Sequence, residues 1–219
     1  MIRQVLVVII VPLLLSGWVG AQETIAVRTL ALRTGDMPDV HLRGVKEHVA
    51  LEFSAIQPGE MLRAMAANPL PLYLREADSR GNEAWVVAHR VKIPAGAKGI
   101  LLLAVPDGDQ SRFLAINDDF AGARYNDWLL INASSKPIAF AVGEKAKPVL
   151  IASGTSVTHR VTVTRGQGTV VLAQAPIDDK PTVFYSTYWP VYDDRRTVVL
   201  FADSGPKILV KRISDMLKR

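Results

Sequence analysis

The stretch 99-GILLLAVPDGDQSRFLAIND-118 decides the fold class, because it joins an apolar strand, a turn and a second strand. This order is that of a β-hairpin whose loop is longer than two residues. A shift of 97 residues places it over 196-RTVVLFADSGPKILVKRISD-215, which has the same order, and Asp118 then matches Asp215. The chain therefore contains two related hairpins.

A second match opens each half of the chain. Leu30–Leu32 lies over Leu129–Ile131, and 40-VHLRG-44 lies over 139-AFAVG-143, both at a shift of 99 residues. Matches at nearly equal shifts predict an internal duplication. Chance resemblance between any two β-hairpins is the alternative.

Working outward, short β-branched and partly alternating segments fill the rest of the chain. Gly, Pro, Asn and Asp separate nearly all of them, which is typical of sandwiches and barrels. The one helical pattern is 60-EMLRAMAA-67, about two turns long. We expect strands at 25–33, 39–43, 49–53, 70–75, 85–93, 99–105, 111–116, 127–132, 137–142, 148–151, 157–164, 168–174, 182–188, 197–202 and 206–212.

The predicted fold class is all-β, with two tandem, similar β-sandwich (immunoglobulin-like) units. Unit 1 spans 22–119 and unit 2 spans 122–219, so the join is short and the units should touch. One larger sandwich with strands shared across the midpoint is the competing architecture. The basic end 211–219 is expected to fray.

Residues 1–21 are predicted to be a signal peptide rather than part of the fold. Arg3 precedes an unbroken apolar run from Val5 to Leu15, and Val19-Gly20-Ala21 supplies small residues before a cut. The run is too short for a spanning helix, and no later apolar stretch is long enough, so no transmembrane span is expected after signal removal. The alternative is an uncleaved anchor.

Composition narrows the compartment and the chemistry. The 219 residues include no cysteine, which excludes a disulfide framework, a Cys-ligated metal and a thiol nucleophile. Secreted eukaryotic domains of this size usually carry disulfides, so the chain favours a bacterial, periplasmic or secreted protein.

Several segments resemble an uncharacterised family of exported bacterial β-sandwich proteins. They are 185-YSTYWP-190, 193-DDRRTVVLF-201, 213-ISD-215 and 130-LINASSKP-137. The resemblance lies mainly in residues 100–219 and implies export and a β-rich fold. The family has no assigned function, so the resemblance implies no catalytic residue.

No catalytic or metal motif is complete. His41 and His48 flank a Gly44 turn, but zinc needs three or four ligands, for which Glu52 is the nearest further candidate. We therefore expect no metal and no cofactor, and strand histidines instead.

Carboxylate pairs and nucleophiles give no clearer signal. Neighbouring carboxylates such as Asp118-Asp119 point to opposite faces of a strand, and 193-DDRR-196 is typical of a charged hairpin loop. A Gly-x-Ser-x-Gly elbow is absent. The sequence thus predicts no catalytic residue.

Aromatic residues gather at 184–192 and form the densest feature. Strand alternation predicts Phe184 and Tyr188 on one face, with Tyr185 and Trp189 on the other. Two interpretations stay open: filler of the core and of the seam between units, or a binding surface built from Tyr185, Tyr188, Trp189 and Tyr192. Because Pro190 follows it, Trp189 is expected at a strand end near the seam.

The net charge of +5 is scattered along the chain, so no nucleic-acid partner is expected. We expect an exported, non-catalytic module that binds a protein or polysaccharide of the envelope, or supports a larger assembly. The alternative is a hydrolase-type enzyme with its site at the seam between the units.

Overall fold

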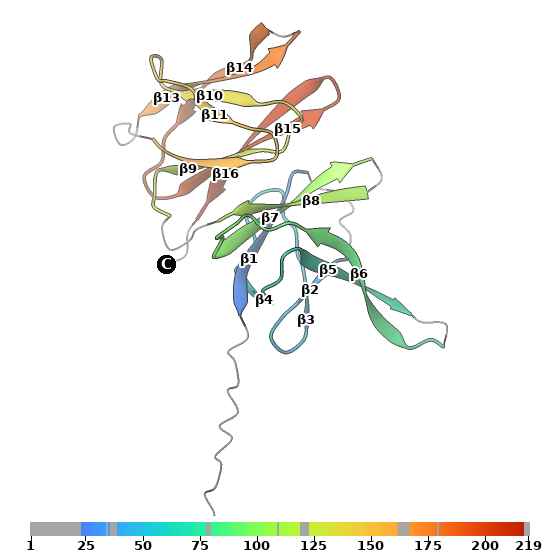
Figure 1. The fold of residues 1–219 in the computed structure, drawn as a ribbon. Helices are drawn as coiled ribbons and strands as arrows, with labels where there is room; N and C mark the ends of the chain where they lie inside the picture. The colour runs from blue at the N-terminus through green and yellow to red at the C-terminus, as the bar shows by residue number, and fades with distance from the viewer. Residues whose placement is uncertain are drawn as a thin grey trace, which may run out of the picture.

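The computed structural model describes residues 23–33, 35, 39–77, 80–108, 110–118, 123–161, 167–178 and 180–216. The predicted signal peptide and residues 119–122 of the join lie outside these ranges. Every regular element within them is a β-strand (Figure 1). Accordingly, the described part of the chain holds no helix that could cross a bilayer.

Eight strands come from the first half of the chain and eight from the second. The first eight are β1 (Thr24–Ala31), β2 (His41–Arg43), β3 (His48–Ala50), β4 (Leu62–Met65), β5 (Leu70–Ala77), β6 (Glu83–Val91), β7 (Gly99–Asp107) and β8 (Gln110–Asn117). The second eight are β9 (Asp127–Asn132), β10 (Ile138–Val142), β11 (Val149–Ile151), β12 (Ser156–Arg160), β13 (Gly168–Ile177), β14 (Lys180–Pro190), β15 (Arg196–Ser204) and β16 (Lys207–Asp215).

These strands form four sheets of four strands each. Sheet A has the order β4-β1-β7-β8 and sheet B the order β3-β2-β5-β6. Sheet C (β12-β9-β15-β16) and sheet D (β11-β10-β13-β14) repeat those orders with every strand number raised by eight. No sheet in the described ranges mixes strands of the two halves.

The repeat extends to single residue pairs. Ile100 pairs with Asn117 in the β7–β8 hairpin, and Thr197 pairs with Ser214 in the β15–β16 hairpin, which keeps the shift of 97 residues. Gly108 and Gly205 close the two turns with the same backbone φ of 60°, which glycine adopts without steric cost.

A β-bulge also recurs. The β5–β6 register shifts between Leu72 and Tyr73, and the β13–β14 register shifts between Ala173 and Gln174. The second bulge inserts Phe184 opposite this step, so Phe184 packs against the core beside Tyr185. The strict alternation expected for this stretch is therefore wrong at Phe184.

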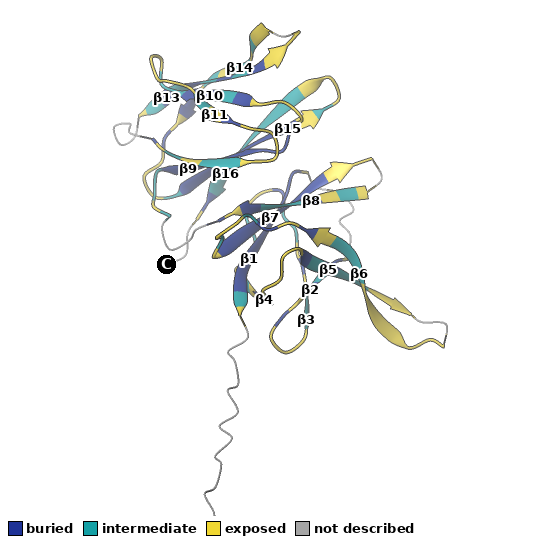
Figure 2. Ribbon diagram, in the orientation of Figure 1, coloured by how far each residue is buried: buried dark blue, intermediate teal, exposed yellow. Residues whose placement is uncertain are grey.

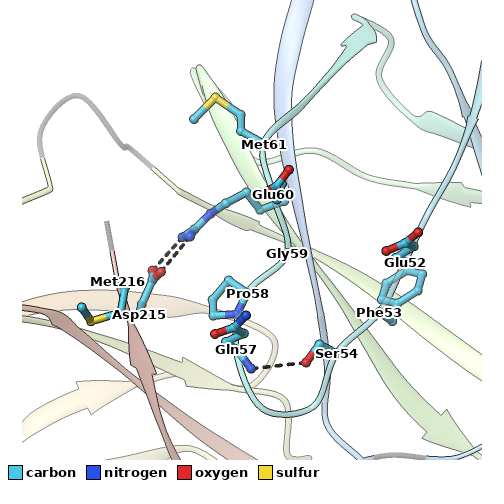
Figure 3. A pocket seen from close by; sticks show the side chains of 11 residues that line it. Glu52, Phe53, Ser54, Gln57, Pro58, Gly59, Glu60, Met61, Asp215 and Met216 are labelled. Atoms are coloured by element: carbon cyan, nitrogen blue, oxygen red, sulfur yellow. Dashed lines mark hydrogen bonds and ion pairs between the residues drawn. The ribbon is translucent and has the colours of Figure 1, made fainter. Parts of the chain in front are cut away.

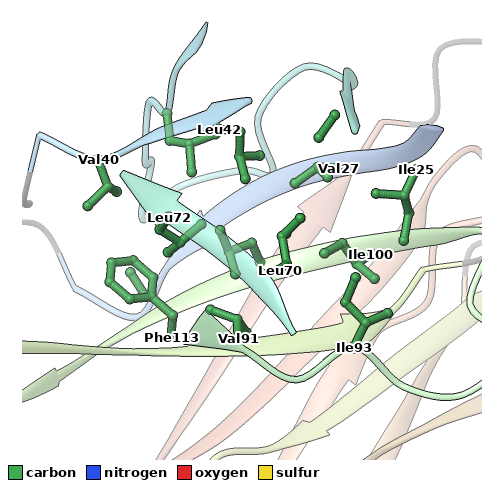
Figure 4. Close-up of a cluster of buried hydrophobic side chains, with 14 residues drawn as sticks. Ile25, Val27, Val40, Leu42, Leu70, Leu72, Val91, Ile93, Ile100 and Phe113 are labelled. Carbon is green, nitrogen blue, oxygen red and sulfur yellow. The ribbon is translucent and has the colours of Figure 1, made fainter. Parts of the chain in front are cut away.

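The four sheets are stacked in the order B, A, C, D, with a hydrophobic core in each gap (Figure 1). Core 1 lies between sheets B and A, and Figure 4 shows its side chains. Core 2 lies between sheets A and C and joins the two halves. Core 3 lies between sheets C and D. Each half is thus a sandwich of two sheets, and the all-β prediction is confirmed.

The middle position of sheet A explains the unbroken apolar run of β7. Ile100 and Leu102 enter core 1, while the alternate residues Leu101 and Leu103 enter core 2. A strand that is covered on both faces needs apolar residues at every position. Figure 2 shows this as dark blue strands in the two middle layers.

Two local expectations are wrong. The helical pattern of 60–67 contains strand β4, whose residues Leu62–Met65 pair with β1 and bury Ala64 in core 1. Pairing with a neighbouring strand outweighs the small helix propensities of a two-turn segment. The expected fraying of 211–219 is wrong for 211–215, because β16 continues through Asp215 and the Lys211 ammonium donates to the Leu32 carbonyl oxygen at 2.8 Å. Residues 217–219 lie outside the described residues.

Candidate functional site

The seam between the halves holds a buried network of Arg28, Asp118, Arg196 and Asp215, called here the arginine–aspartate network. Arg28 donates to Asp118 at 3.0 Å and to Asp215 at 2.7 Å. Arg196 lies 2.7 Å from Asp118 and 2.5 Å from Asp215. Each arginine therefore contacts both aspartates, of which Asp118 belongs to the first half of the chain and Asp215 to the second.

Burial makes this network energetically important. The four side chains are at most 6% exposed. Burial alone would raise the pKa of Asp215, but hydrogen bonds from Arg28 and the charges of Arg196 and Arg28 hold that pKa below its ordinary value. Burial likewise opposes the charge of Arg196, whose pKa is nevertheless raised by Asp118 and Asp215. The sequence-based expectation that 193-DDRR-196 is wholly a charged loop is therefore wrong at Arg196.

A cavity of about 580 Å³ opens beside this network (Figure 3). Its lining includes Glu52 and Glu60 from the loop before β4, together with Asp215. Figure 3 shows the part of that loop around Pro58 and Gly59 between Glu52 and Asp215. Glycoside hydrolysis needs two carboxyl groups that face one bond, and one of them must act as a general acid with a raised pKa. The pKa of Asp215 is lowered, so Asp215 does not fit the role of that acid.

The four aromatic residues predicted as a binding surface divide into two groups. Trp189 is 8% exposed and lies in core 3, with its ring 5.6 Å from that of Trp128 and 5.8 Å from that of Tyr185. Tyr188 is 63% exposed and Tyr192 is 36% exposed. The expectation that Trp189 lies at the seam is wrong, because core 2 fills the seam with aliphatic side chains.

The two exposed tyrosines are held in place by polar contacts. The Tyr188 hydroxyl accepts a hydrogen bond from the Gly168 amide at 3.1 Å. The guanidinium groups of Arg195 and Arg212 lie 4.5 Å and 5.9 Å from the centre of the Tyr192 ring. Such cation–π contacts orient a ring while leaving part of it open to solvent.

A second aromatic group covers the outer face of sheet B and is called here the Trp85 cluster. Its members are His48, His41, Tyr73 and Trp85, one from each of the strands β3, β2, β5 and β6. The Trp85 ring is stacked on His48 at 4.2 Å and is tilted against His41 at 4.8 Å. Tyr73 meets His48 edge-on at 4.7 Å.

Strand alternation explains why these rings face outward. Leu42 and Leu72, the strand neighbours of His41 and Tyr73, point inward and fill core 1. Trp85 pairs across the strands with the exposed Arg75, which forms an ion pair with Glu83. The sheet therefore presents one apolar ring bordered by charged groups.

His41 and His48 are the two histidines that the sequence offered as metal ligands, and both lie in the Trp85 cluster. Glu52, the third ligand considered from the sequence, lines the seam cavity instead. Across the described ranges, no three metal-ligating side chains gather. Burial, and then the charges of Arg43 and His41, lower the pKa of His48 below its ordinary value.

Comparisons with known proteins supply no identification. No protein-family model matches the chain, and no curated protein matches it. The resemblance to an uncharacterised exported family therefore stays an expectation.

Sequence reasoning missed Trp85, Tyr73 and the arginine–aspartate network. The network had a visible signal, because the repeat aligns Asp118 with Asp215, and Arg28 interrupts an apolar strand. The Trp85 cluster had no such signal in the sequence, because its four residues are spread over more than 40 positions and meet only when the sheet forms.

Proposed function

We propose that this chain is an exported, non-catalytic module that binds a component of the cell envelope, or supports an assembly there or outside the cell. The sequence of residues 1–21 supports export, since it has the order of a cleavable signal. The mature chain would then start at Gln22.

We further propose that the module consists of two tandem immunoglobulin-like units, 22–119 and 122–219. The repeated strand order, the equal hairpin registers and the recurrent bulge support this duplication. The size of each unit and its two packed sheets fit an immunoglobulin-type sandwich. The aliphatic core 2 would hold the two units at a fixed angle.

The observation that carries the binding role is the placement of aromatic rings on the outer sheets. Trp85 on sheet B is 40% exposed and Tyr188 on sheet D is 63% exposed, although large rings usually bury. Exposed aromatic residues on rigid strands are the usual anchors of binding surfaces. The seam instead uses its charged residues to neutralise one another.

A hydrolase site at the seam is the second candidate, favoured by the cavity that Glu52 and Glu60 line. The binding proposal and the hydrolase alternative predict different results for a double variant of the outer rings and for a variant of Glu52. Under the binding proposal, Trp85→Ala combined with Tyr188→Ala lowers the amount of protein that sediments with insoluble envelope material, whereas Glu52→Gln does not.

The experiment uses protein recovered from the envelope of the expressing cells, with its amino terminus sequenced. A terminus at Gln22 and selective loss of sedimentation in the double variant support the proposal. A cytosolic product that keeps Met1 would refute export. Hydrolysis of an envelope polymer that is abolished by Glu52→Gln would refute the non-catalytic role.

A further inference from the structure

The Trp85 cluster has the geometry of a prepared platform. The indole of Trp85 lies at 20° to the His48 ring, and His41 and Tyr73 pack around this pair. These neighbours restrict the rotation of Trp85 before any ligand arrives. A side chain that is already ordered loses less conformational entropy on binding.

The platform is not needed to close a core. Core 1 is filled from the opposite face of sheet B by Leu42, Leu70 and Leu72. Trp85 is not among the side chains of that core and keeps 40% of its surface exposed. The ring therefore offers an apolar surface at the outside of a rigid sheet.

Charged residues occupy neighbouring positions in the strand register of the Trp85 cluster. Arg43 pairs across the strands with His48, and Arg75 pairs across the strands with Trp85. Arg75 also holds Glu83 in an ion pair at the hairpin end of the sheet. A guanidinium group donates hydrogen bonds to a hydroxyl oxygen, and a carboxylate accepts a hydrogen bond from a hydroxyl group. The charged residues beside the platform can therefore bind a hydroxyl group in either role.

The outer face of sheet D has a different chemistry. Leu150 is 76% exposed and Val183 is 47% exposed, and Tyr188 lies on the same sheet. That face exposes two aliphatic side chains beside one tyrosine, whereas the sheet B face combines one flat ring with charged groups. A protein partner suits the aliphatic face, since apolar anchors dominate protein interfaces.

We propose that the Trp85 cluster binds a glycan, with a pyranose ring stacked on Trp85 and its hydroxyls bonded by Arg43, Arg75 and Glu83. A pyranose has a face of C–H groups and a border of hydroxyls, which matches an apolar ring with a polar border. This inference rests on the proposed binding function and assigns its ligand class. The sugars would belong to a polysaccharide chain laid across strands β2, β5 and β6.

The test is affinity electrophoresis of the full mature chain in native gels that contain soluble polysaccharides. One set of gels holds neutral polymers, such as a β-glucan and a galactomannan, and another holds uronates, such as alginate and polygalacturonate. We expect at least one polymer to retard the protein. Trp85→Ala should weaken that binding by roughly tenfold or more, since the sugar ring would lose its apolar contact with the indole. Trp85→Phe should keep part of the retardation.

Tyr188→Ala is the matched control, because it removes an exposed ring from the opposite outer sheet. It should leave the retardation unchanged. Circular dichroism and thermal unfolding verify that each variant is folded, and His48→Ala replaces Trp85→Ala if the latter does not fold. Retardation by uronates alone, lost in Arg43→Ala, supports the proposal and identifies an acidic glycan.

The inference is overturned if no polymer retards the protein, or if folded Trp85→Ala is retarded like the unaltered chain. These results leave the broader function testable. Sedimentation with envelope material that survives Trp85→Ala but fails in Tyr188→Ala would indicate a protein partner on sheet D. If the unaltered protein does not sediment with envelope material at all, the proposed function is refuted instead.

Discussion

Replacement of Asp215 by Asn tests how far the arginine–aspartate network stabilises the fold. Asp215 accepts four hydrogen bonds, two from Arg28 at 2.8 and 2.7 Å and two from Arg196 at 3.0 and 2.5 Å. Asparagine keeps the shape but removes the negative charge, and its amide group turns N–H donors toward guanidinium donors. Arg28 and Arg196 would then each lose one of the two carboxylates that contact them inside the seam.

The expected cost follows from this burial. Removing one partner of a buried ion pair costs about 3–5 kcal/mol, because an uncompensated charge stays inside the protein. That is a large share of the roughly 5–15 kcal/mol that stabilises a typical protein. At about 2–4 °C per kcal/mol for a chain of this size, the Tm should fall by roughly 6–20 °C.

The measurement is urea unfolding followed by tryptophan fluorescence, at pH 7 and at several acidic pH values. The pKa of Asp215 is lowered in the folded state, so its stabilisation is complete above the unfolded pKa of about 4 and is lost as pH falls through the folded pKa. The variant lacks this group. The stability difference between the two proteins should therefore be largest near neutral pH and shrink below about pH 4.

Asp203→Asn is the control, since Asp203 is exposed and accepts one hydrogen bond from the Ser135 amide at 2.8 Å. Its free energy of unfolding should change by no more than about 1 kcal/mol. A change below about 1 kcal/mol for Asp215→Asn at pH 7 would refute the reasoning. So would a difference between the two proteins that widens toward acidic pH.

Two further variants probe sheet D. Trp189→Ala should lower the free energy of unfolding by about 3–5 kcal/mol in thermal or urea denaturation, because the ring fills core 3 beside Trp128; a melting curve like that of the unaltered protein would contradict this packing. Gly168→Ala should also destabilise the protein, by about 1–3 kcal/mol, since its Cβ would lie 2.8 Å from the Trp189 backbone carbonyl oxygen and would overlap the Tyr188 ring. Gly35→Ala, which meets no atom within 4 Å, should change the Tm little, and equal Tm values for both glycine variants would argue against the contact.

Local sequence determined most of the strands of this protein. Strand β9 occupies the expected 127–132, and each of the other expected strand segments overlaps a strand of the structure. The reason is that strand formation here depends on β-branched and apolar runs bounded by turn residues, which are local properties. The repeated hairpin was equally visible, because its turn glycines and apolar runs recur at one shift.

The tertiary structure alone decided the partners of these strands and of their side chains. Leu62–Met65 is a strand only because β1 offers a free edge, and Arg196 is buried only because Asp118 and Asp215 neutralise it. Likewise, Trp189 enters core 3 rather than the seam because sheet A and sheet C bring aliphatic faces together.

The candidate site shows the same division. Alternation along each strand is written in the sequence, so one face of sheet B had to be outward. Which four rings would meet on that face depended on the order β3-β2-β5-β6, which brings together His48, His41, Tyr73 and Trp85. Strand order is set by the packing of whole sheets against one another, and therefore only the folded chain brings these residues into one cluster.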